Sequence, residues 1–159
     1  MNASITIRKA TVNDAHNVAV MVGELLNEIM NVMDISFFNF NLEETKGRLS
    51  DFIACEKYFV YIAHNEQADP LGFVTLFEGY ALYAEGAFGT IPELFVRPNF
   101  RSQNIGQHLL EQAKVFARSR GWKRLEVTTP PLPQFEKTLS FYEREKFEIT
   151  GGRKLKALL

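Results

Sequence analysis

The sequence contains a single cysteine, Cys55, among 159 residues, so no disulfide can form within the chain. This excludes the disulfide framework of small secreted domains and indicates a reducing compartment. No apolar run approaches the roughly 20 residues that a membrane-spanning helix needs. The first residues also lack the apolar centre of a signal peptide. We therefore expect a protein of the cytoplasm with no membrane partner.

An excess of charge of either sign is also missing. The chain has 18 Lys and Arg residues against 19 Asp and Glu residues, which gives a formal net charge of -1. Nucleic acids and anionic membranes are bound by clustered positive charge, so we expect no nucleic-acid partner. No group of His, Cys and Asp residues has the spacing of metal ligands, and no metal is expected.

Apolar and aromatic residues are abundant. They make up 46% and 13% of the chain, and 14 residues are phenylalanine. A chain of this length buries about two-thirds of its unfolded surface when it folds as one unit. Neither an internal repeat nor a low-complexity linker divides the sequence. A single domain over residues 1–159 is therefore predicted.

The hydrophobic period changes several times along the chain and predicts both strands and helices. Helices are predicted at residues 11–30, 42–54, 105–120 and 135–147. Strands are predicted at residues 4–10, 58–65, 71–82, 90–96, 123–129 and, as one bent strand or a tight hairpin, 148–158. Residues 83–89 are predicted to form a loop. The strand–helix–strand segment from 90 to 129 implies a parallel pair with a right-handed crossover. The fold class is thus α/β, with a mixed sheet flanked by about four helices.

Three helix ends carry recognisable signals. Thr11 and Asp14 have the spacing of a capping box before the first helix. Asn41 suits the N-cap of the second helix. Gly121 suits the position after the end of the third helix, where the backbone turns left-handed.

The stretch "VRPNFRSQNIGQHLL", residues 96–110, joins a predicted strand to a helix through a polar turn. Unpaired N–H groups and a partial positive charge at a helix start suit a phosphate group. Gly106 lets a ligand approach the backbone, Asn104 tolerates a left-handed conformation, and Arg101 can pair with phosphate oxygens. An ordinary helix cap is the alternative, and the turn alone does not decide between the two.

A second motif lies about forty residues further on. The segment "ELFVRPNFRSQNIGQHLLEQAKVFARSRGWKRLEVTT" resembles the acetyl-CoA-binding core of the GNAT N-acetyltransferase superfamily, and "TLSFYEREKFEITGG" resembles its Phe-Tyr-Glu helix. The chain departs from the family pattern at Asn104, where the first glycine of the motif usually stands, and at Lys146, where a glycine usually precedes Phe147. The resemblance covers essentially the whole chain and implies a mostly antiparallel, twisted sheet with a splayed parallel strand pair.

The resemblance also implies where the cofactor binds. The pantetheine arm of acetyl-CoA would pair with the backbone of Leu94, Phe95 and Val96. The pyrophosphate would be wrapped by the backbone amides of Arg101, Ser102, Gln103, Asn104, Ile105, Gly106 and Gln107. A strand N–H near Phe95 or Val96 would polarise the thioester carbonyl.

Two side chains are implied in the chemistry. Tyr142 matches the tyrosine of the family that reaches the cofactor sulfur, and it is the candidate general acid. Its alternative is a core aromatic residue. Glu93 is the candidate base or an anchor for a cationic substrate, and its alternative is a solvated or ion-paired strand carboxylate. His64 and His108 are rival bases by residue type, but both are predicted at the surface. Cys55 is predicted to be a small buried residue.

The acceptor site implied by the family lies between the first two helices and the middle strands. Aromatic side chains with a few acids suit a cation that carries an apolar body; their alternative is to cap an open sheet edge. The candidates are Phe37, Phe38, Tyr80 and Glu78, with Phe40, Tyr83, Glu85 and Phe88 beside them. The sequence therefore predicts an acetyl-CoA-dependent N-acetyltransferase that acts on a primary amine, in a small molecule or a peptide, by direct attack in a ternary complex. A non-catalytic acyl-CoA sensor is the alternative, and the end "KLKALL" suits pairing with a second copy of the chain.

Overall fold

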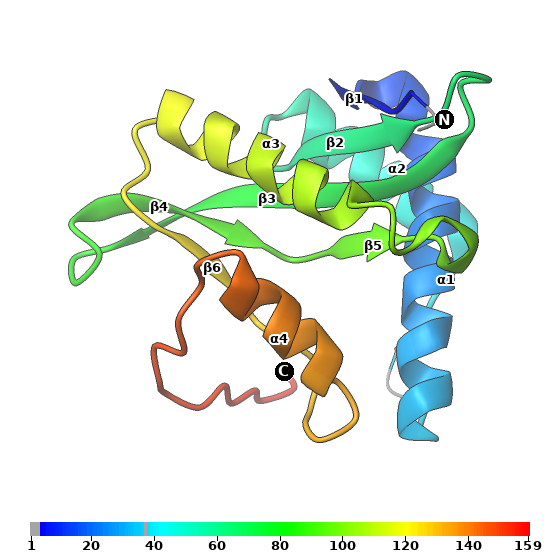
Figure 1. Ribbon diagram of the computed structural model, residues 1–159. Coiled ribbons are helices and arrows are strands. Elements are labelled where there is room, and N and C mark those ends of the chain that lie inside the picture. Colours follow the sequence, from blue (N-terminus) through cyan, green and yellow to red (C-terminus); the bar gives the residue numbers. More distant parts are fainter. Residues whose placement is uncertain (1–3, 37) are drawn as a thin grey trace. The chain divides into compact units, whose positions relative to one another are not determined.

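The computed structural model describes residues 4–36 and 38–159 (Figure 1). Phe37, one of the acceptor candidates, lies outside the described residues. The chain forms two compact units, Met1–Thr128 and Thr129–Leu159. Each unit is described by itself, and the prediction of a single domain stays a prediction.

The first unit is built on a mixed six-stranded sheet. Its path runs β1 (Thr6–Lys9), β2 (Phe59–His64), β3 (Pro70–Ala81), β4 (Gly86–Ile91) and β6 (Leu125–Val127), while β5 (Leu94–Val96) pairs with β3 beside β4. The β4–β6 pair is parallel, and the other pairings are antiparallel. This confirms the predicted mixed, mostly antiparallel sheet and its parallel pair.

Strand β2 is buried along its whole length because helices cover both faces of the sheet. Phe59 and Tyr61 point to one face, where both rings contact Phe116 of α3 (Ile105–Ser119). Val60 and Ile62 point to the other face and join the core formed with α1 (Ala15–Met33) and α2 (Leu42–Ala54). Figure 1 shows α3 in front of β2 and β3, with α2 behind them. The alternation of side chains along a strand thus supplies both cores.

The predicted helix ends are confirmed. Thr11 and Asp14 form a reciprocal capping box around a short 3-10 turn (Val12–Asp14) that precedes α1. The Asn41 side chain accepts a hydrogen bond from the N–H of Glu44 at 3.0 Å at the start of α2. Gly121 has a φ of 75° after α3.

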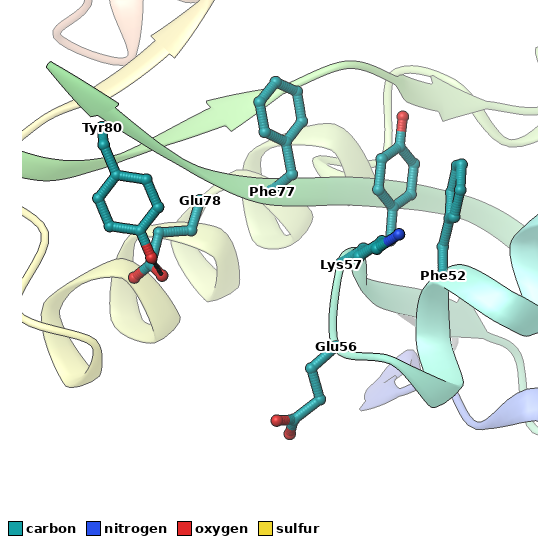
Figure 2. A pocket seen from close by; sticks show the side chains of 7 residues that line it. Phe52, Glu56, Lys57, Phe77, Glu78 and Tyr80 are labelled. Atoms are coloured by element: carbon teal, nitrogen blue, oxygen red, sulfur yellow. Dashed lines mark hydrogen bonds between the residues drawn. The ribbon is translucent and has the colours of Figure 1, made fainter.

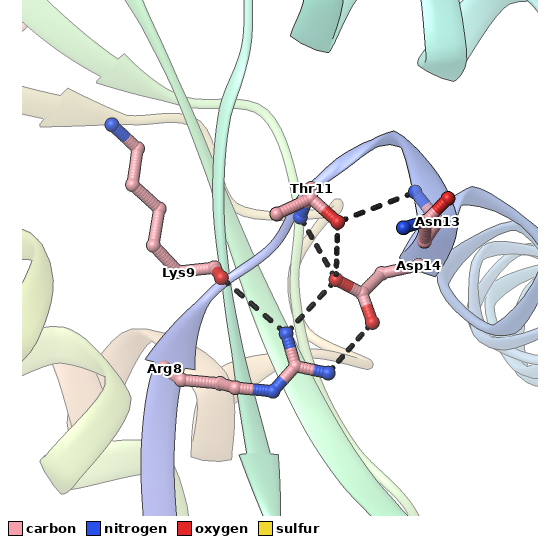
Figure 3. Close-up of polar contacts among 5 residues, drawn as sticks. All are labelled: Arg8, Lys9, Thr11, Asn13 and Asp14. Carbon is pink, nitrogen blue, oxygen red and sulfur yellow. Dashed lines mark hydrogen bonds and ion pairs between the residues drawn. The ribbon is translucent and has the colours of Figure 1, made fainter.

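Asp14 also ties β1 to the start of α1, which the sequence did not predict. The Arg8 guanidinium donates to both oxygens of the Asp14 carboxylate, at 2.9 and 2.7 Å (Figure 3). The N–H of Thr11 donates to Asp14 Oδ2 at 2.8 Å. The hydrogen bond from Arg8 is the main cause that lowers the pKa of Asp14. The carboxylate therefore fixes the angle at which the chain leaves the sheet and enters the helix.

Two predictions around the fourth strand were wrong. Gly86 to Gly89 belong to β4 rather than to a loop, because they pair with residues 78–81 of β3. A Cβ atom on Gly89 would lie 2.3 Å from Cε3 of Trp122. The predicted strand at 90–96 is also two strands, because β4 ends at Ile91 and β5 begins at Leu94.

The second unit contains α4 (Glu136–Arg144), which is shorter than the predicted helix. The predicted strand or hairpin at 148–158 was wrong, since these residues form no regular element. Gly151 and Gly152 both have a positive φ, but the exposed residues around them pair with no strand in the described part of the chain. A turn signal makes a hairpin only where two strands can satisfy each other's backbone groups.

Candidate active site

Strand β5 has one hydrogen-bonded edge and one open edge. It pairs with β3 in the register Gly72–Val96, Phe73–Phe95 and Val74–Leu94. The parallel pairing of β4 with β6 ends at Ile91 and Val127, before β5 begins. Among the described residues no second strand pairs with β5.

The alternation of the ladder shows which groups of β5 point to the open edge. The N–H of Thr75 donates to the carbonyl of Glu93 at 2.9 Å, and the N–H of Arg97 donates to the carbonyl of Leu71 at 2.9 Å. Hydrogen-bonded positions in an antiparallel pair alternate along the strand. The backbone groups of Leu94 and Val96 therefore point away from β3, whereas those of Phe95 face it.

The turn after β5 is held to α1 by two ion pairs. The Arg97 side chain bonds Glu24 at 3.0 Å, and the Arg101 guanidinium donates to both oxygens of Glu28, at 2.8 and 2.7 Å. Arg101 Nε also donates to the carbonyl of Val96 at 2.8 Å. The guanidinium predicted to meet a phosphate is thus engaged with Glu28, and it fixes the position of the turn.

The turn ends in a left-handed residue at the start of α3. Asn104 has φ 62° and ψ 17°, the conformation that the missing glycine of the motif would adopt most easily. The first intrahelical bond runs from the N–H of His108 to the carbonyl of Asn104. The N–H groups from Asn104 to Gln107 make no hydrogen bond within the described residues. Such groups at a helix start form a site for an anion.

Glu93 lies between β4 and β5, and its carboxylate contacts Thr75 of β3 and Tyr58, the residue just before β2. The Thr75 hydroxyl donates a hydrogen bond to Glu93 Oε2, and it accepts one from the N–H of Glu93 at 3.0 Å. The Tyr58 hydroxyl lies 3.5 Å from Glu93 Oε1. Burial raises the pKa of Glu93, and the two hydroxyl groups oppose this shift. Glu93 makes no ion pair in the described part of the chain, contrary to the alternative of an ion-paired carboxylate.

Two cavities share Phe52 and Tyr58 in their walls, and Glu93 lines the smaller of them. The smaller, of about 130 Å³, contains Glu93 and Thr75 and is closed by side chains of α1 and α2. The larger, of about 370 Å³, is lined by Phe52, Glu56, Lys57, Tyr58, Phe77, Glu78 and Tyr80. The rings of Tyr58 and Phe77 are stacked with their centroids 6.3 Å apart. An aromatic wall thus leads from the surface toward the carboxylate.

Two of the acceptor candidates lie together in the larger cavity. The Tyr80 hydroxyl donates to Glu78 Oε2 at 2.6 Å, and the indole of Trp122 donates to Glu78 Oε1 at 2.7 Å. Figure 2 shows Tyr80 and Glu78 at one end of the cavity, with Phe77 between them and Lys57, and Glu56 pointing away. Phe38 is 41% exposed and lines neither cavity.

Tyr142, the candidate acid, belongs to α4 in the second unit. It is buried, and its ring packs against those of Phe141 and Phe147 with centroids 5.3 and 5.4 Å away. Burial raises the pKa of Tyr142 far above neutrality, so the phenol keeps its proton. Lys146, the second departure from the family motif, has a φ of 73°, which is again the conformation of a glycine.

The remaining reactive side chains contribute less. His64 is buried, not at the surface as predicted, and desolvation is the main cause that lowers its pKa. Cys55 is exposed, not buried, because it follows the last turn of α2. His108 is exposed, as predicted. Residues 4–36 and 38–159 contain no group of three His, Cys, Asp or Glu side chains that can hold a metal, and no helix long and apolar enough to cross a membrane.

Sequence reasoning missed Tyr58 and Thr75. Thr75 is 1% exposed and is the single polar side chain in the run "LGFVTLF". A lone hydroxyl in a buried strand needs a hydrogen-bond partner, which was a usable signal. Tyr58 carried no such signal, because its contact with Glu93 depends on the pairing of strands far apart in sequence.

An open strand edge, a helix start with unpaired N–H groups and a carboxylate just before the strand form an arrangement that suits an acyl-coenzyme A. A sequence model of the acetyltransferase (GNAT) family matches residues 26–147, which is more than half of the chain. The chain therefore belongs to the GNAT acetyltransferase family, and it is an acetyl-CoA-dependent N-acetyltransferase. This confirms the resemblance drawn from the two motifs. Enzymes of this family acetylate amines of small molecules or peptides.

Individual relatives agree with this assignment. The chain is 28% identical over 152 residues to an aminoalkylphosphonate N-acetyltransferase of Salmonella typhimurium, with 96% of this chain and 90% of the relative covered. A predicted acetyltransferase from Clostridium acetobutylicum, solved with acetyl-CoA, is 14% identical with a TM-score of 0.79 over 96% of each chain. An integron cassette protein from a salt-marsh metagenome is 21% identical with a TM-score of 0.79 over 96% of this chain and 90% of that one. The two solved structures share the fold.

Proposed function

We propose that this enzyme transfers the acetyl group directly to a primary amine while both substrates are bound. The observation that carries the proposal is the position of Glu93, whose partly buried carboxylate adjoins both the open edge of β5 and a cavity. An amine in that cavity would lie between a proton acceptor and the thioester. No covalent intermediate on the enzyme is needed in this arrangement.

The chain's own backbone supplies the proposed cofactor site. Leu94 and Val96 turn their N–H and C=O groups to the open edge, where an extended pantetheine arm can bond them as a strand would. Phe95 contributes through its place in the strand, since its backbone groups face β3. The N–H of Val96 is then the better donor for the thioester oxygen, because the N–H of Phe95 faces β3.

The pyrophosphate is proposed to bind the turn at residues 101–107. The free N–H groups at the start of α3 support this, together with the left-handed Asn104 that directs the turn around them. Arg101 contributes by holding the turn against Glu28, since its N–H already donates to the carbonyl of Pro98 at 3.3 Å.

Replacing Asn104 with valine is expected to weaken coenzyme A binding and to lower the free energy of unfolding by about 1–2 kcal/mol, because a branched residue is strained at a positive φ. Calorimetric titration with coenzyme A and thermal unfolding measure the two effects. The matched control is Asn104→Gly, which adopts the same φ without strain and should keep the affinity. Equal affinity in the valine variant would show that the turn does not form the cradle.

The acceptor is proposed to enter through the larger cavity and to place its amine at Glu93. Stacked rings and the Glu78 carboxylate suit a cation with an apolar body. Arg48 in the smaller cavity and Lys57 in the larger one add two positive charges, which suit an acceptor that also carries an acidic group. A relative named for aminoalkylphosphonates makes that class worth testing first.

The test is an amine panel incubated with acetyl-CoA, with release of free thiol as the readout. The panel contains an aminoalkylphosphonate, a polyamine, an aminoglycoside, an amino acid and a peptide amine. Thiol release that requires one of these amines supports the proposal. Binding of coenzyme A without turnover of any amine would instead support the non-catalytic sensor. The location of the protein in the cytoplasm, the absence of a bound metal and the pairing of two copies of the chain stay predictions.

A further inference from the structure

The contacts of Glu93 are unequal for its two carboxylate oxygens. Within the described residues Oε2 accepts a hydrogen bond from the Thr75 hydroxyl, whereas Oε1 has only the 3.5 Å contact with the Tyr58 hydroxyl. A contact of 3.5 Å lies at the limit of hydrogen bonding, so Oε2 is the oxygen that is held more firmly. Oε1 is left as the oxygen able to accept a proton.

Thr75 forms hydrogen bonds with both the backbone and the side chain of Glu93. Its hydroxyl accepts from the N–H of Glu93 and donates to the carboxylate, while its own N–H donates to the carbonyl of Glu93 at 2.9 Å. A hydroxyl group carries one hydrogen, so the Thr75 hydroxyl donates and accepts its hydrogen bonds with the same residue, Glu93. The torsions of Glu93 are thereby fixed relative to β3, which is the most extensively paired strand of the sheet.

We propose that Thr75 and Tyr58 are positioning residues for Glu93, which hold its carboxylate so that Oε1 is the oxygen presented to an amine in the smaller cavity. The proposal rests on the proposed role of Glu93 as base. In that step the ammonium proton passes to Oε1, so that an N–H bond breaks and an O–H bond forms. The amine regains its lone pair, and Glu93 becomes a neutral acid.

The surroundings of Glu93 show what can influence its ionisation. Side chains of α1 that line the smaller cavity are apolar, Val18 and Val22. From α2 the one charged group in its wall is Arg48, whose guanidinium bonds Glu44 at 3.1 Å. The remaining facing polar groups are Thr75 of β3 and Tyr58, the residue just before β2. Because both hydroxyl groups stabilise the carboxylate and burial opposes it, removal of either hydroxyl should make Glu93 harder to ionise.

The experiment titrates Glu93 directly, without an acceptor. Carbon-13 NMR of protein labelled in glutamate carboxyl groups follows each side chain with pH, and the Glu93 signal is the one that Glu93→Gln lacks. Thr75→Val is expected to move the titration midpoint of Glu93 upward by about one pH unit, because a hydrogen bond to a charged group is lost. Thr75→Ser keeps the hydroxyl and should restore the midpoint.

Thermal unfolding of the same variants separates positioning from general destabilisation. A merely structural Thr75 would lower the unfolding temperature in the valine variant and leave the midpoint unchanged, which would overturn the proposal. If Thr75→Val does not fold, Tyr58→Phe replaces it, with a smaller upward shift expected and no shift as the contrary result. The titration involves no turnover. An unchanged midpoint would therefore contradict the positioning role of Thr75 without deciding whether Glu93 is the base.

Discussion

Glu93→Gln is expected to lower kcat by a factor of about 100–1,000, because the variant keeps the shape of the side chain but cannot accept the ammonium proton. The wild-type rate should rise with pH as Glu93 loses its proton. Burial raises the pKa of Glu93, so this rise should lie above the ordinary range of a glutamate. The glutamine variant should lack it.

The measurement is the pH dependence of thiol release for the wild type and the variant, with an amine that the enzyme turns over. Glu43→Gln makes the same exchange on the exposed first turn of α2, away from both cavities. It serves as the control for the loss of one negative charge. A rise with pH that survives in Glu93→Gln would remove Glu93 as the base and leave it the role of an anchor.

Tyr142→Phe is expected to lower kcat by a factor of about 100 while the affinity for coenzyme A changes little. The departing thiolate needs a proton, and a phenol that stays protonated at neutral pH can donate one. The ring packing with Phe141 and Phe147 is retained in phenylalanine, so α4 should keep its structure.

Steady-state rates and calorimetric titration with coenzyme A measure the two quantities for Tyr142→Phe. Tyr61→Phe is the matched control, because Tyr61 is also buried but packs against Phe116 under α3. A variant at Tyr142 with the wild-type rate would leave the tyrosine as a core aromatic residue, which was the alternative from the sequence.

Most of the fold was predictable because it depends on local patterns. Such patterns depend on residues close together in the sequence. Examples are the change of hydrophobic period at Tyr58, the capping box at Thr11 and the glycine at position 121. The prediction of a loop at residues 83–89 failed at Gly89, where the ring of Trp122 occupies the space that a side chain would fill. It failed again at residues 148–158, because a strand requires a partner that no local pattern reveals.

The residues of the candidate site also differ in how far the sequence predicted them. The left-handed Asn104 follows from the turn's own sequence, whereas Glu93 was named through the resemblance to the family and lay inside the strand predicted at 90–96. The hydrogen bonds between Thr75 and Glu93 depend on the register between β3 and β5, which brings together residues 18 positions apart in the sequence. Arg101 shows the converse case, in which a residue type suited to phosphate is taken by a carboxylate of α1.

The shortness of β5 has a consequence for the solubility of the protein. An open strand edge is a template onto which a strand of another molecule can add, and long flat edges promote aggregation. β5 has three residues, and the carbonyl of Val96 at its end is already occupied by Arg101. What remains is long enough for a small extended ligand but too short to nucleate a strand from another chain. The open edge of β5 therefore offers little surface for edge-to-edge association with another molecule.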